Sequence, residues 1–425
     1  MLPNDPAYQA YLSILRDELV PATGCTEPVA IAYASAKARQ LLCAPPERAE
    51  IKVSGNIIKN VKSVVVPGTG GLKGIQAAAA AGIVAGDADA RLQVIAHITP
   101  ADRAAIERCM NKMAFTVACA DSPFLFDIDL TLFGGGNRAR VRIVESHTNI
   151  VLIEANGETL LERAPEAAPE ETDAGRSLLN VKDIVEFADT VELEDIRPVI
   201  ARQIACNTAI AEEGLRRPYG ANIGKTLLKD FGSDVSARAR AYAAAGSDAR
   251  MSGCEMPVVI VSGSGNQGMT ASLPVIEYAR ALAVPEEKLY RALALSALIT
   301  IHQKTGIGRL SAFCGATSAG CGAGAGIAYL YGGGFDVIAH TVVNTLAIVS
   351  GMVCDGAKPS CAAKIASAVD AAILGYRMYQ NGDQFYDGDG IIKKGVDNTI
   401  CNVGRLAREG MHQTDRTILK IMTEG

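Results

Sequence analysis

The sequence predicts an α+β protein, in which a domain with a mixed or antiparallel sheet is inserted in or precedes a large all-α domain. Between residues 46 and 165, short segments alternate apolar and polar residues with the period of two that is typical of strands. From residue 178 to residue 425 such segments become scarce, and apolar residues recur with helical spacing. The intervening segment, Arg163 to Ser177, is rich in proline, alanine and acidic residues, which predicts a linker.

Residues 46–165 are expected to form the α+β domain. The predicted strands are AEIKVSG, NVKSVVVPG, RLQVIAHI, AFTVACA, DIDLTLF, ARVRIVES and NIVLIEA. Helices are expected near Leu72–Ala85 and Ala101–Met113, between strands. The segment FGGGN, Phe133 to Asn137, predicts a hairpin turn, and Gly68 to Gly71 predicts a tight turn from a strand into a helix.

Residues 178–425 are expected to form an all-α domain whose alanine and glycine content allows helices to pack closely. The predicted helices are Val181–Thr190, Glu194–Glu213, Val235–Ala245, Ala271–Ala283, Glu286–Ile301, Ala325–Tyr331, Val337–Val353 and Cys361–Leu374. A third unit, residues 1–45, begins with an amphipathic helix over Asp5–Leu19 and continues into a second helix from Thr26.

Charge and composition exclude two classes of partner. The net charge is −5 and the basic residues are dispersed, so we expect no nucleic-acid partner. Two uncharged stretches, Leu310–Phe335 and Val337–Val353, are long enough to span a bilayer. The first is mostly glycine, alanine and serine, the second carries His340 and Asn344, and the chain has no Trp to anchor a membrane interface. We therefore expect both stretches inside the protein, and no membrane contact.

The cysteine content predicts a location. Eleven cysteines in a chain whose first residues are charged and helical, without a hydrophobic leader, are typical of a reducing compartment. We therefore expect the protein to be cytoplasmic.

Cys25 lies directly before the second helix, in the segment TGCTEP. Thr26 is a favourable N-cap, and Glu27 and Pro28 suit the first helical turn. The helix dipole and free N–H groups at this position favour an anion, so they lower the pKa of a thiol and make the thiolate available as a base or nucleophile, although Glu27 opposes that shift. The alternative is a helix entry that contains an ordinary buried cysteine.

Cys314, Cys354 and Cys361 each lie beside small residues, at separations of 40 and 7 positions. An iron–sulfur cluster needs several thiolates that converge on one point and backbone amides that approach its sulfurs, which glycine and alanine permit. The alternative is that the three are small core hydrophobes, because the chain holds no compact pair of cysteines at this place.

Three polar loops in the helical half are candidate ligand sites. Ser262, Ser264, Asn266 and Gln267 precede a helix and offer hydroxyl, amide and backbone N–H groups to a carboxylate. His302 to Gly306 (HQKTG) follows a helix and contains Lys304, although His302 alone is more typical of a core histidine. A third loop, Asp387 to Gly390, lacks the later acidic ligands of a calcium loop and predicts a turn.

Five separated features together resemble the L-cysteine desulfidase family, which is related to the iron–sulfur L-serine dehydratases of the alpha-chain type. They are the segments TGCTEP, SGSGNQG, HQKTG and DNTICNVGRLAREGM and the spacing of the three cysteines. The resemblance covers nearly the whole chain. It implies that Cys314, Cys354 and Cys361 hold a 4Fe–4S cluster with one open iron, which protein prepared in air can lack; Cys321 is not expected to be a ligand.

The resemblance also implies a reaction: elimination of hydrogen sulfide from L-cysteine, which leaves pyruvate and ammonia after hydrolysis. Cys25 would be the base that removes the Cα proton. Thr26, Glu27, Ser262, Ser264, Asn266 and Gln267 are expected to bind the amino-acid substrate, and Lys304 to neutralise its carboxylate. Because Cys25 must then reach the cluster, we expect residues 1–45 to pack with the helical half. We also expect a homodimer.

Three other functions remain open. L-Serine dehydration could use the same cluster, since one iron site accepts oxygen or sulfur. A pyridoxal-phosphate lyase would need a lysine beside a phosphate loop, and Lys59, Lys73 and Lys225 are the candidates. A non-catalytic amino-acid sensor would bind its ligand in the α+β domain and assemble through the helical domain.

Overall fold

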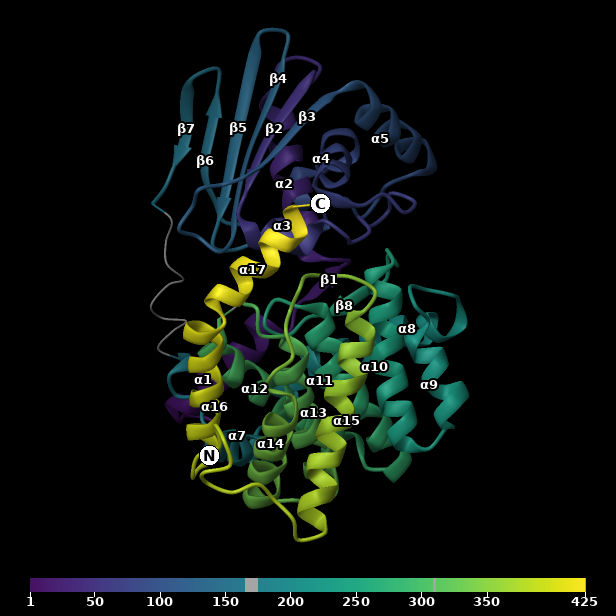
Figure 1. The fold of residues 1–425 in the computed structure, drawn as a ribbon, viewed down its shortest axis with the longest axis vertical. Helices are drawn as coiled ribbons and strands as arrows, with labels where there is room; N and C mark the ends of the chain where they lie inside the picture. The colour runs from purple at the N-terminus through teal and green to yellow at the C-terminus, as the bar shows by residue number, and fades with distance from the viewer. Residues whose placement is uncertain (165–174, 309–310, 425) are drawn as a thin grey trace.

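The computed structural model describes residues 1–164, 175–308 and 311–424. It shows a sheet-containing part stacked on a larger helical part (Figure 1), which confirms the predicted α+β class. Most of the predicted linker, residues 165–174, lies outside the described residues.

The sheet has six strands in the order β3-β2-β4-β5-β6-β7, and only the β2–β3 pair is parallel. The strands are β2 (Arg48–Val53), β3 (Ala114–Cys119), β4 (Asp127–Gly134), β5 (Asn137–Val144), β6 (Ile150–Ala155) and β7 (Glu158–Glu162). The predicted FGGGN turn joins β4 to β5, and its Gly135 and Gly136 have φ of 55° and 78°, as a two-residue hairpin loop requires.

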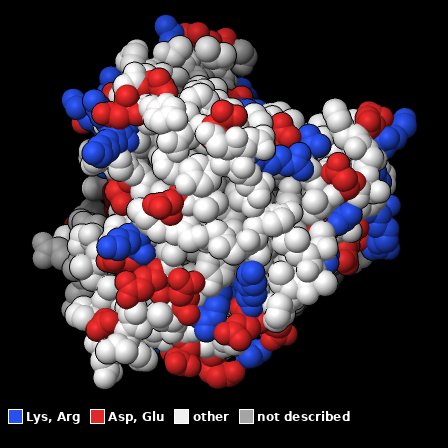
Figure 2. Space-filling view, turned by 90° about the horizontal axis from the view of Figure 1, so that it is seen from below, with Lys and Arg blue, Asp and Glu red and all other residues white. Residues whose placement is uncertain are grey.

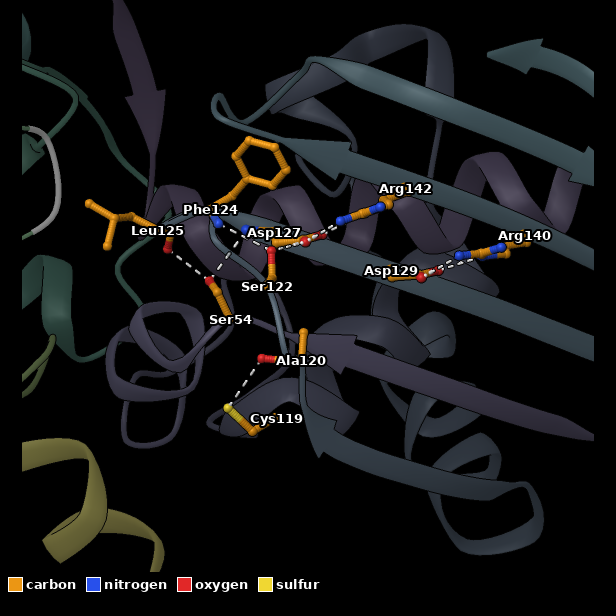
Figure 3. Close-up of polar contacts among 10 residues, drawn as sticks. All are labelled: Ser54, Cys119, Ala120, Ser122, Phe124, Leu125, Asp127, Asp129, Arg140 and Arg142. Atoms are coloured by element: carbon orange, nitrogen blue, oxygen red, sulfur yellow. Dashed lines mark hydrogen bonds and ion pairs between the residues drawn. The ribbon is translucent and has the colours of Figure 1, made fainter. Parts of the chain in front are cut away.

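Apolar side chains on one face of this sheet pack against α2 (Thr26–Leu41) and α4 (Gly74–Ala85), while α5 (Pro100–Lys112) packs against α4. The other face carries charged cross-strand pairs: Arg140 binds Asp129, and Arg142 binds Asp127 (Figure 3). The alternation in β4 and β5 therefore separates an apolar core from a paired polar surface.

Two predicted strands are wrong. Residues 60–68 contain the end of α3 (Gly55–Val61) and a turn, with one isolated bridge from Val65 to Lys73. Residues 91–98 contain the end of a 3₁₀ helix, Ala88–Gln93, and turns. Val64, Val66, Val94 and Ile95 are all buried, so their apolar pattern reflects packing against the core without strand pairing.

The helical part is built mainly around α13, which packs against α11, α12, α14 and α15. Its helices are α1 (Pro6–Glu18), α7 (Val181–Thr190), α8 (Leu193–Arg216), α9 (Ile223–Phe231), α10 (Val235–Met251), α11 (Gly265–Leu282), α12 (Glu286–Ile307), α13 (Gly315–Leu330), α14 (Phe335–Val349), α15 (Cys361–Gln380), α16 (Val396–Arg405) and α17 (His412–Thr423). A short π-helix, Leu406–Gly410, joins the last two.

Helix α13 begins at Gly315, ten residues before the predicted start at Ala325, because its glycines serve helix packing. A Cβ atom at Gly322 would overlap Ser296 and Thr300 of α12, and one at Gly320 would overlap Ala368 of α15. Glycine weakens an isolated helix, so the sequence pattern alone did not indicate a helix here.

The first 45 residues contribute to both parts. Helix α1 packs in the core of the helical part, and β1 (Pro21–Thr23) pairs with β8 (Pro257–Val259) of that part. Helix α2 packs in the core of the sheet-containing part. Cys25 therefore lies where the chain passes from one part to the other.

Helix α17 makes a second connection between the parts, since it leaves the helical part and ends beside α3 (Figure 1). Lys59 of α3 forms an ion pair with Asp415, and Lys62 donates to the carbonyl of Met422. A Cβ atom at Gly55 would overlap Leu419. The C-terminal helix thus fixes α3 against the helical part.

Seen from below, the helical part shows acidic and basic side chains side by side around a broad region without charged residues (Figure 2). Among the helices of the described residues, none has the length and apolarity that a bilayer span requires.

Candidate active site

A cavity of about 1270 Å³ lies between the two parts and is lined by both. Ten of the eleven predicted site residues line it; only Thr26, which is buried, does not. The ten are Cys25, Glu27, Ser262, Ser264, Asn266, Gln267, Lys304, Cys314, Cys354 and Cys361. His302 does not line this cavity and binds Asp397 at 2.8 Å.

Cys314 and Cys354 are brought side by side by a short backbone ladder. Phe313 and Val353 form an antiparallel bridge, Cys354 N donates to Ala312 O at 2.6 Å, and Cys314 N donates to Met352 O at 3.0 Å. Cys314 is the N-cap of α13. The bridge therefore holds Cys354, 40 positions farther along the chain, beside the start of this helix.

Cys361 is the first residue of α15, and its thiol donates to Gly356 O at 3.6 Å. Gly356 has a φ of +94°, and a Cβ atom there would overlap the backbone of Lys59 in α3. The loop between Cys354 and Cys361 therefore needs glycine to approach the sheet-containing part.

The three thiols influence one another electrostatically. Burial, and then the neighbouring Cys354, raises the pKa of Cys314 to about 12. Burial also raises the pKa of Cys361, and Cys354 adds to that rise. Thiolates at this place therefore need a compensating positive charge, as a metal centre or a nearby lysine supplies.

Three thiols are the donors that an iron–sulfur cluster takes from a protein. Cys314, Cys354 and Cys361 all line the cavity, whereas Cys321 is buried in the helical core and does not line it. Among the described residues, no three His, Cys, Asp or Glu side chains form a group that could hold a metal ion.

Lysines surround the three thiols. Lys304 is buried, and burial lowers its pKa to about 8, although Cys354 and Cys314 favour its charged form. Lys364 donates to Val353 O at 2.8 Å and forms an ion pair with Asp355. The positive charge of these lysines would stabilise an anionic cluster or an anionic substrate bound in the cavity.

Cys25 is the N-cap of α2 and is almost fully buried. Its thiol donates to Glu27 Oε2 at 3.0 Å, and the other oxygen of Glu27 accepts from Asn60 Nδ2 at 3.1 Å. Burial, followed by Glu27, raises the pKa of Cys25 well above its usual range, while Arg250 lowers it. The expected lowering of the pKa by the helix N-terminus is thus outweighed, and the hydrogen bond to Glu27 favours the protonated thiol. Cys25 packs in one small cluster with Cys361.

The SGSGNQG segment forms a two-residue turn of type I′ before α11. Val261 and Ser264 exchange both backbone hydrogen bonds, and Ser262 and Gly263 have φ of 49° and 75°. A serine in this left-handed conformation is strained, which is common at functional sites. Ser262 Oγ and Gln267 Oε1 are buried and have no hydrogen-bond partner among the described residues, so both are available to a ligand.

The sheet-containing part supplies the opposite wall of the cavity. Asn56, Lys59 and Asn60 of α3 line it, together with loop residues from 125–126 and 145–149. Ser54, just before α3, holds the first of these loops: its hydroxyl donates to Leu125 O at 2.8 Å and accepts from Asp127 N at 3.3 Å (Figure 3).

Two buried cations were not predicted as part of this site: Arg250 was not singled out, and Lys59 was named only as a candidate for a pyridoxal-phosphate lyase. Arg250 of α10 and Lys59 of α3 are 3% and 2% exposed, and both line the cavity. Arg250 does have a signal in the sequence, since it follows Asp248 in an otherwise alanine-rich, uncharged helix segment. Lys59 lies among residues that were predicted as a loop and strand, and we find no comparable signal for it.

Comparison with known proteins places the chain in a family. Residues 89–420 match the model of the serine dehydratase alpha chain. The chain belongs to the serine dehydratase alpha chain family. This confirms the predicted relationship to L-serine dehydratases. The region that matches this family model contains Cys314, Cys354 and Cys361 and the SGSGNQG loop, but begins after Cys25 and α3.

Members with similarity along the whole chain carry the name UPF0597 protein. The one from Desulfitobacterium hafniense is 59% identical over 419 residues, which cover 99% of this chain and 97% of that protein. Those from Lachnoclostridium phytofermentans and Treponema denticola are 52% and 46% identical, and each alignment covers 98% of this chain, with 99% and 98% of the respective relative. Their names state no activity, so the reaction must be argued from the site.

Proposed function

We propose that this protein is an iron–sulfur-dependent carbon–sulfur lyase that converts L-cysteine into pyruvate, ammonia and hydrogen sulfide. One observation carries the proposal: Cys314, Cys354 and Cys361 line the same cavity as Cys25, and Cys361 packs against the small apolar cluster that contains Cys25. A cluster site and a basic group within reach of it are the two parts that such an elimination needs.

Cys314, Cys354 and Cys361 would hold a 4Fe–4S cluster. When bound, a cluster with three protein thiolates leaves one iron free to act as a Lewis acid on the substrate carboxylate and leaving group, without a redox change.

The chain's own residues would move the proton. Glu27 accepts the thiol proton of Cys25, and the resulting thiolate removes the proton from Cα of the substrate. The electron pair of the broken Cα–H bond forms the Cα=Cβ bond, and the Cβ–S bond breaks with its electrons on sulfur, which leaves as hydrosulfide. The aminoacrylate product tautomerises to an imine, and water converts the imine into pyruvate and ammonia.

The cavity would also orient the substrate. Ser262 Oγ and Gln267 Oε1 offer unused acceptors for an α-ammonium group, and Lys304 offers positive charge on the side of Cys314 and Cys354. Because these groups are buried, a bound amino acid is held away from bulk water, which strengthens each of these interactions.

L-Serine dehydration is the second candidate, because the family description names a serine dehydratase. Both reactions need the same base and cluster and differ only in the atom that leaves Cβ.

An anaerobic assay separates these functions. The full chain is reconstituted with iron and sulfide, desalted, and given L-cysteine or L-serine while sulfide and pyruvate are measured. Sulfide and pyruvate in equal amounts from L-cysteine, at a higher kcat/KM than for L-serine, support the proposal. Preferred dehydration of L-serine supports the second candidate and rejects the first. No turnover of either amino acid favours the sensor.

A further inference from the structure

Arg250 occupies an unusual position for a buried cation. It lies in the last turn of α10, is 3% exposed and lines the cavity. Its Nε donates to Gly24 O at 3.0 Å, and its Nη1 donates to Asn266 Oδ1 at 3.2 Å. Both acceptors are neutral, so these bonds orient the guanidinium group without balancing its charge.

No carboxylate within the described ranges forms an ion pair with Arg250, in contrast to the buried Lys59, which pairs with Asp415. Glu27 accepts from Cys25 and Asn60, and Asp248 accepts from the backbone N–H of Gly224. An arginine stays protonated under all physiological conditions, whereas a lysine can lose its proton when buried. A buried arginine without an acidic partner therefore indicates that an anion from outside the chain completes the site.

The geometry also indicates which kind of anion. The guanidinium group lies between Gly24, which precedes Cys25, and the start of α11, where a Cβ atom at Gly265 would overlap it. Two of its five N–H groups are used, and three remain for a ligand. A planar fork of donors matches the two oxygens of a carboxylate.

Groups near Arg250 are suited to bind the ammonium group of an α-amino acid whose carboxylate binds Arg250. Because Arg250 contacts Gly24, the residue before Cys25, a carboxylate bound to Arg250 would lie near Cys25. Gln267 Oε1, in the first turn of α11, and Ser262 Oγ, in the turn before that helix, are acceptors without partners among the described residues and suit an α-ammonium group.

We propose that Arg250, oriented by Gly24 and Asn266, binds the α-carboxylate of the substrate. The proposal rests on the proposed lyase function and narrows its substrates to amino acids with a free α-carboxylate; amino-acid amides and decarboxylated amines are excluded.

The test uses two ligands that have no leaving group on Cβ and are not consumed: L-alanine and L-alaninamide, which lacks the carboxylate. Their affinities for the full-length, anaerobically reconstituted protein are measured by titration calorimetry. The variants are Arg250→Gln and Arg250→Lys, with Arg240→Gln as the control on the same helix, where Arg240 pairs with Asp370 away from the cavity.

Wild type and Arg240→Gln are expected to bind L-alanine at least tenfold more tightly than L-alaninamide. Arg250→Gln should weaken the binding of L-alanine by about 10- to 100-fold and change the affinity for L-alaninamide by less than about threefold. Arg250→Lys should weaken L-alanine by an intermediate factor, because it keeps the charge and loses the fork.

Equal affinity of wild type for the two ligands overturns the proposal. An equal loss of affinity for both ligands in Arg250→Gln also overturns it, because a purely structural role of Arg250 would produce that result. If Arg250→Gln does not fold, Arg250→Lys decides, and an unchanged affinity for L-alanine in it rejects the subsite. The proposed reaction is judged separately: a preference for L-alanine that depends on Arg250, without sulfide release from L-cysteine, keeps the subsite and rejects only the reaction.

Discussion

The thiol of Cys25 donates a hydrogen bond to Glu27 Oε2 across 3.0 Å. The two residues lie at the start of α2, where the chain passes from the helical part to the sheet-containing part. Burial and Glu27 both raise the pKa of the thiol and so favour its protonated form, while Asn60 holds Glu27 in place. In the proposed reaction, Glu27 is the group beside Cys25 that can take this proton when the base is needed. Any basic role of Cys25 therefore depends on Glu27.

We expect Cys25→Ser to lower kcat for L-cysteine by at least about 100-fold, since it removes the base. Glu27→Gln should lower kcat by about tenfold, because the amide cannot take the thiol proton. Both variants should retain the iron content of wild type, measured per chain after reconstitution. Cys43→Ser, at an exposed cysteine, is the matched control and should be fully active. Normal turnover by Cys25→Ser would exclude the thiolate base.

Cys354→Ser should abolish stoichiometric iron binding, since a hydroxyl group is a poor cluster ligand and two thiols do not hold the cluster. The measurement is iron per chain together with the visible absorbance after anaerobic reconstitution. Cys321→Ala should keep both, because Cys321 is buried in the helical core away from the cavity. Loss of iron in the Cys321 variant, or its retention in the Cys354 variant, would contradict this ligand set.

Asp415→Asn should destabilise the protein by about 2 kcal/mol, because it leaves the buried Lys59 without its ion-pair partner. The loss should be smaller than that of a fully buried pair, since Asp415 is 22% exposed. The midpoint of urea unfolding measures the effect. Glu424→Gln, which removes an exposed pair between Lys420 of α17 and the C-cap residue of that helix, should change stability by less than about 0.5 kcal/mol. Equal effects of the two variants would show that α17 does not hold α3 through this pair.

Asp248→Asn should make stability less dependent on pH. Burial raises the pKa of Asp248 to about 6, above the value of about 3.9 for an unfolded chain. Between these values the folded state binds more protons than the unfolded state, so Asp248 favours folding at low pH and that contribution is lost as the pH rises to about 6.

Between pH 4.5 and pH 7.5 the stability of the Asp248 variant relative to wild type should therefore rise by about 2 kcal/mol, measured as the difference in the free energy of unfolding in guanidinium chloride. Asp230→Asn, at an exposed aspartate of α9, serves as the control and should show no such gain. A constant difference between Asp248→Asn and wild type across this range would remove Asp248 as the source of the pH dependence.

Much of the fold follows from local patterns in the sequence. β4 and β5 alternate because one face of each strand is buried, and α7 coincides with its predicted range. The patterns predicted the wrong element where contacts with residues distant in the sequence determine the structure of an apolar or glycine-rich segment. Val64 and Val66 are buried without a strand partner, and the first part of α13 is helical because its glycines fit against α12 and α15.

The candidate site divides in the same way. Motifs indicated the cysteines and the Ser262 loop, and the structure brings these residues to one cavity; their roles remain proposals. Arg250 and Lys59 could not be assigned, because the meaning of a buried charge depends on whether an acidic group faces it. For Lys59 that group lies on α17, more than 350 positions along the chain. For Arg250, the described residues contain no such group within ion-pair distance.

The bridge between Phe313 and Val353 bears on how the two parts of the protein would share the proposed reaction. It closes a hairpin of two successive helices, α13 and α14, and Cys361 follows shortly after it at the start of α15. The three thiols that we propose as cluster ligands therefore belong to the helical part alone, whereas Cys25 lies where the chain passes into the sheet-containing part. A change in how the two parts meet would then impair turnover without releasing iron.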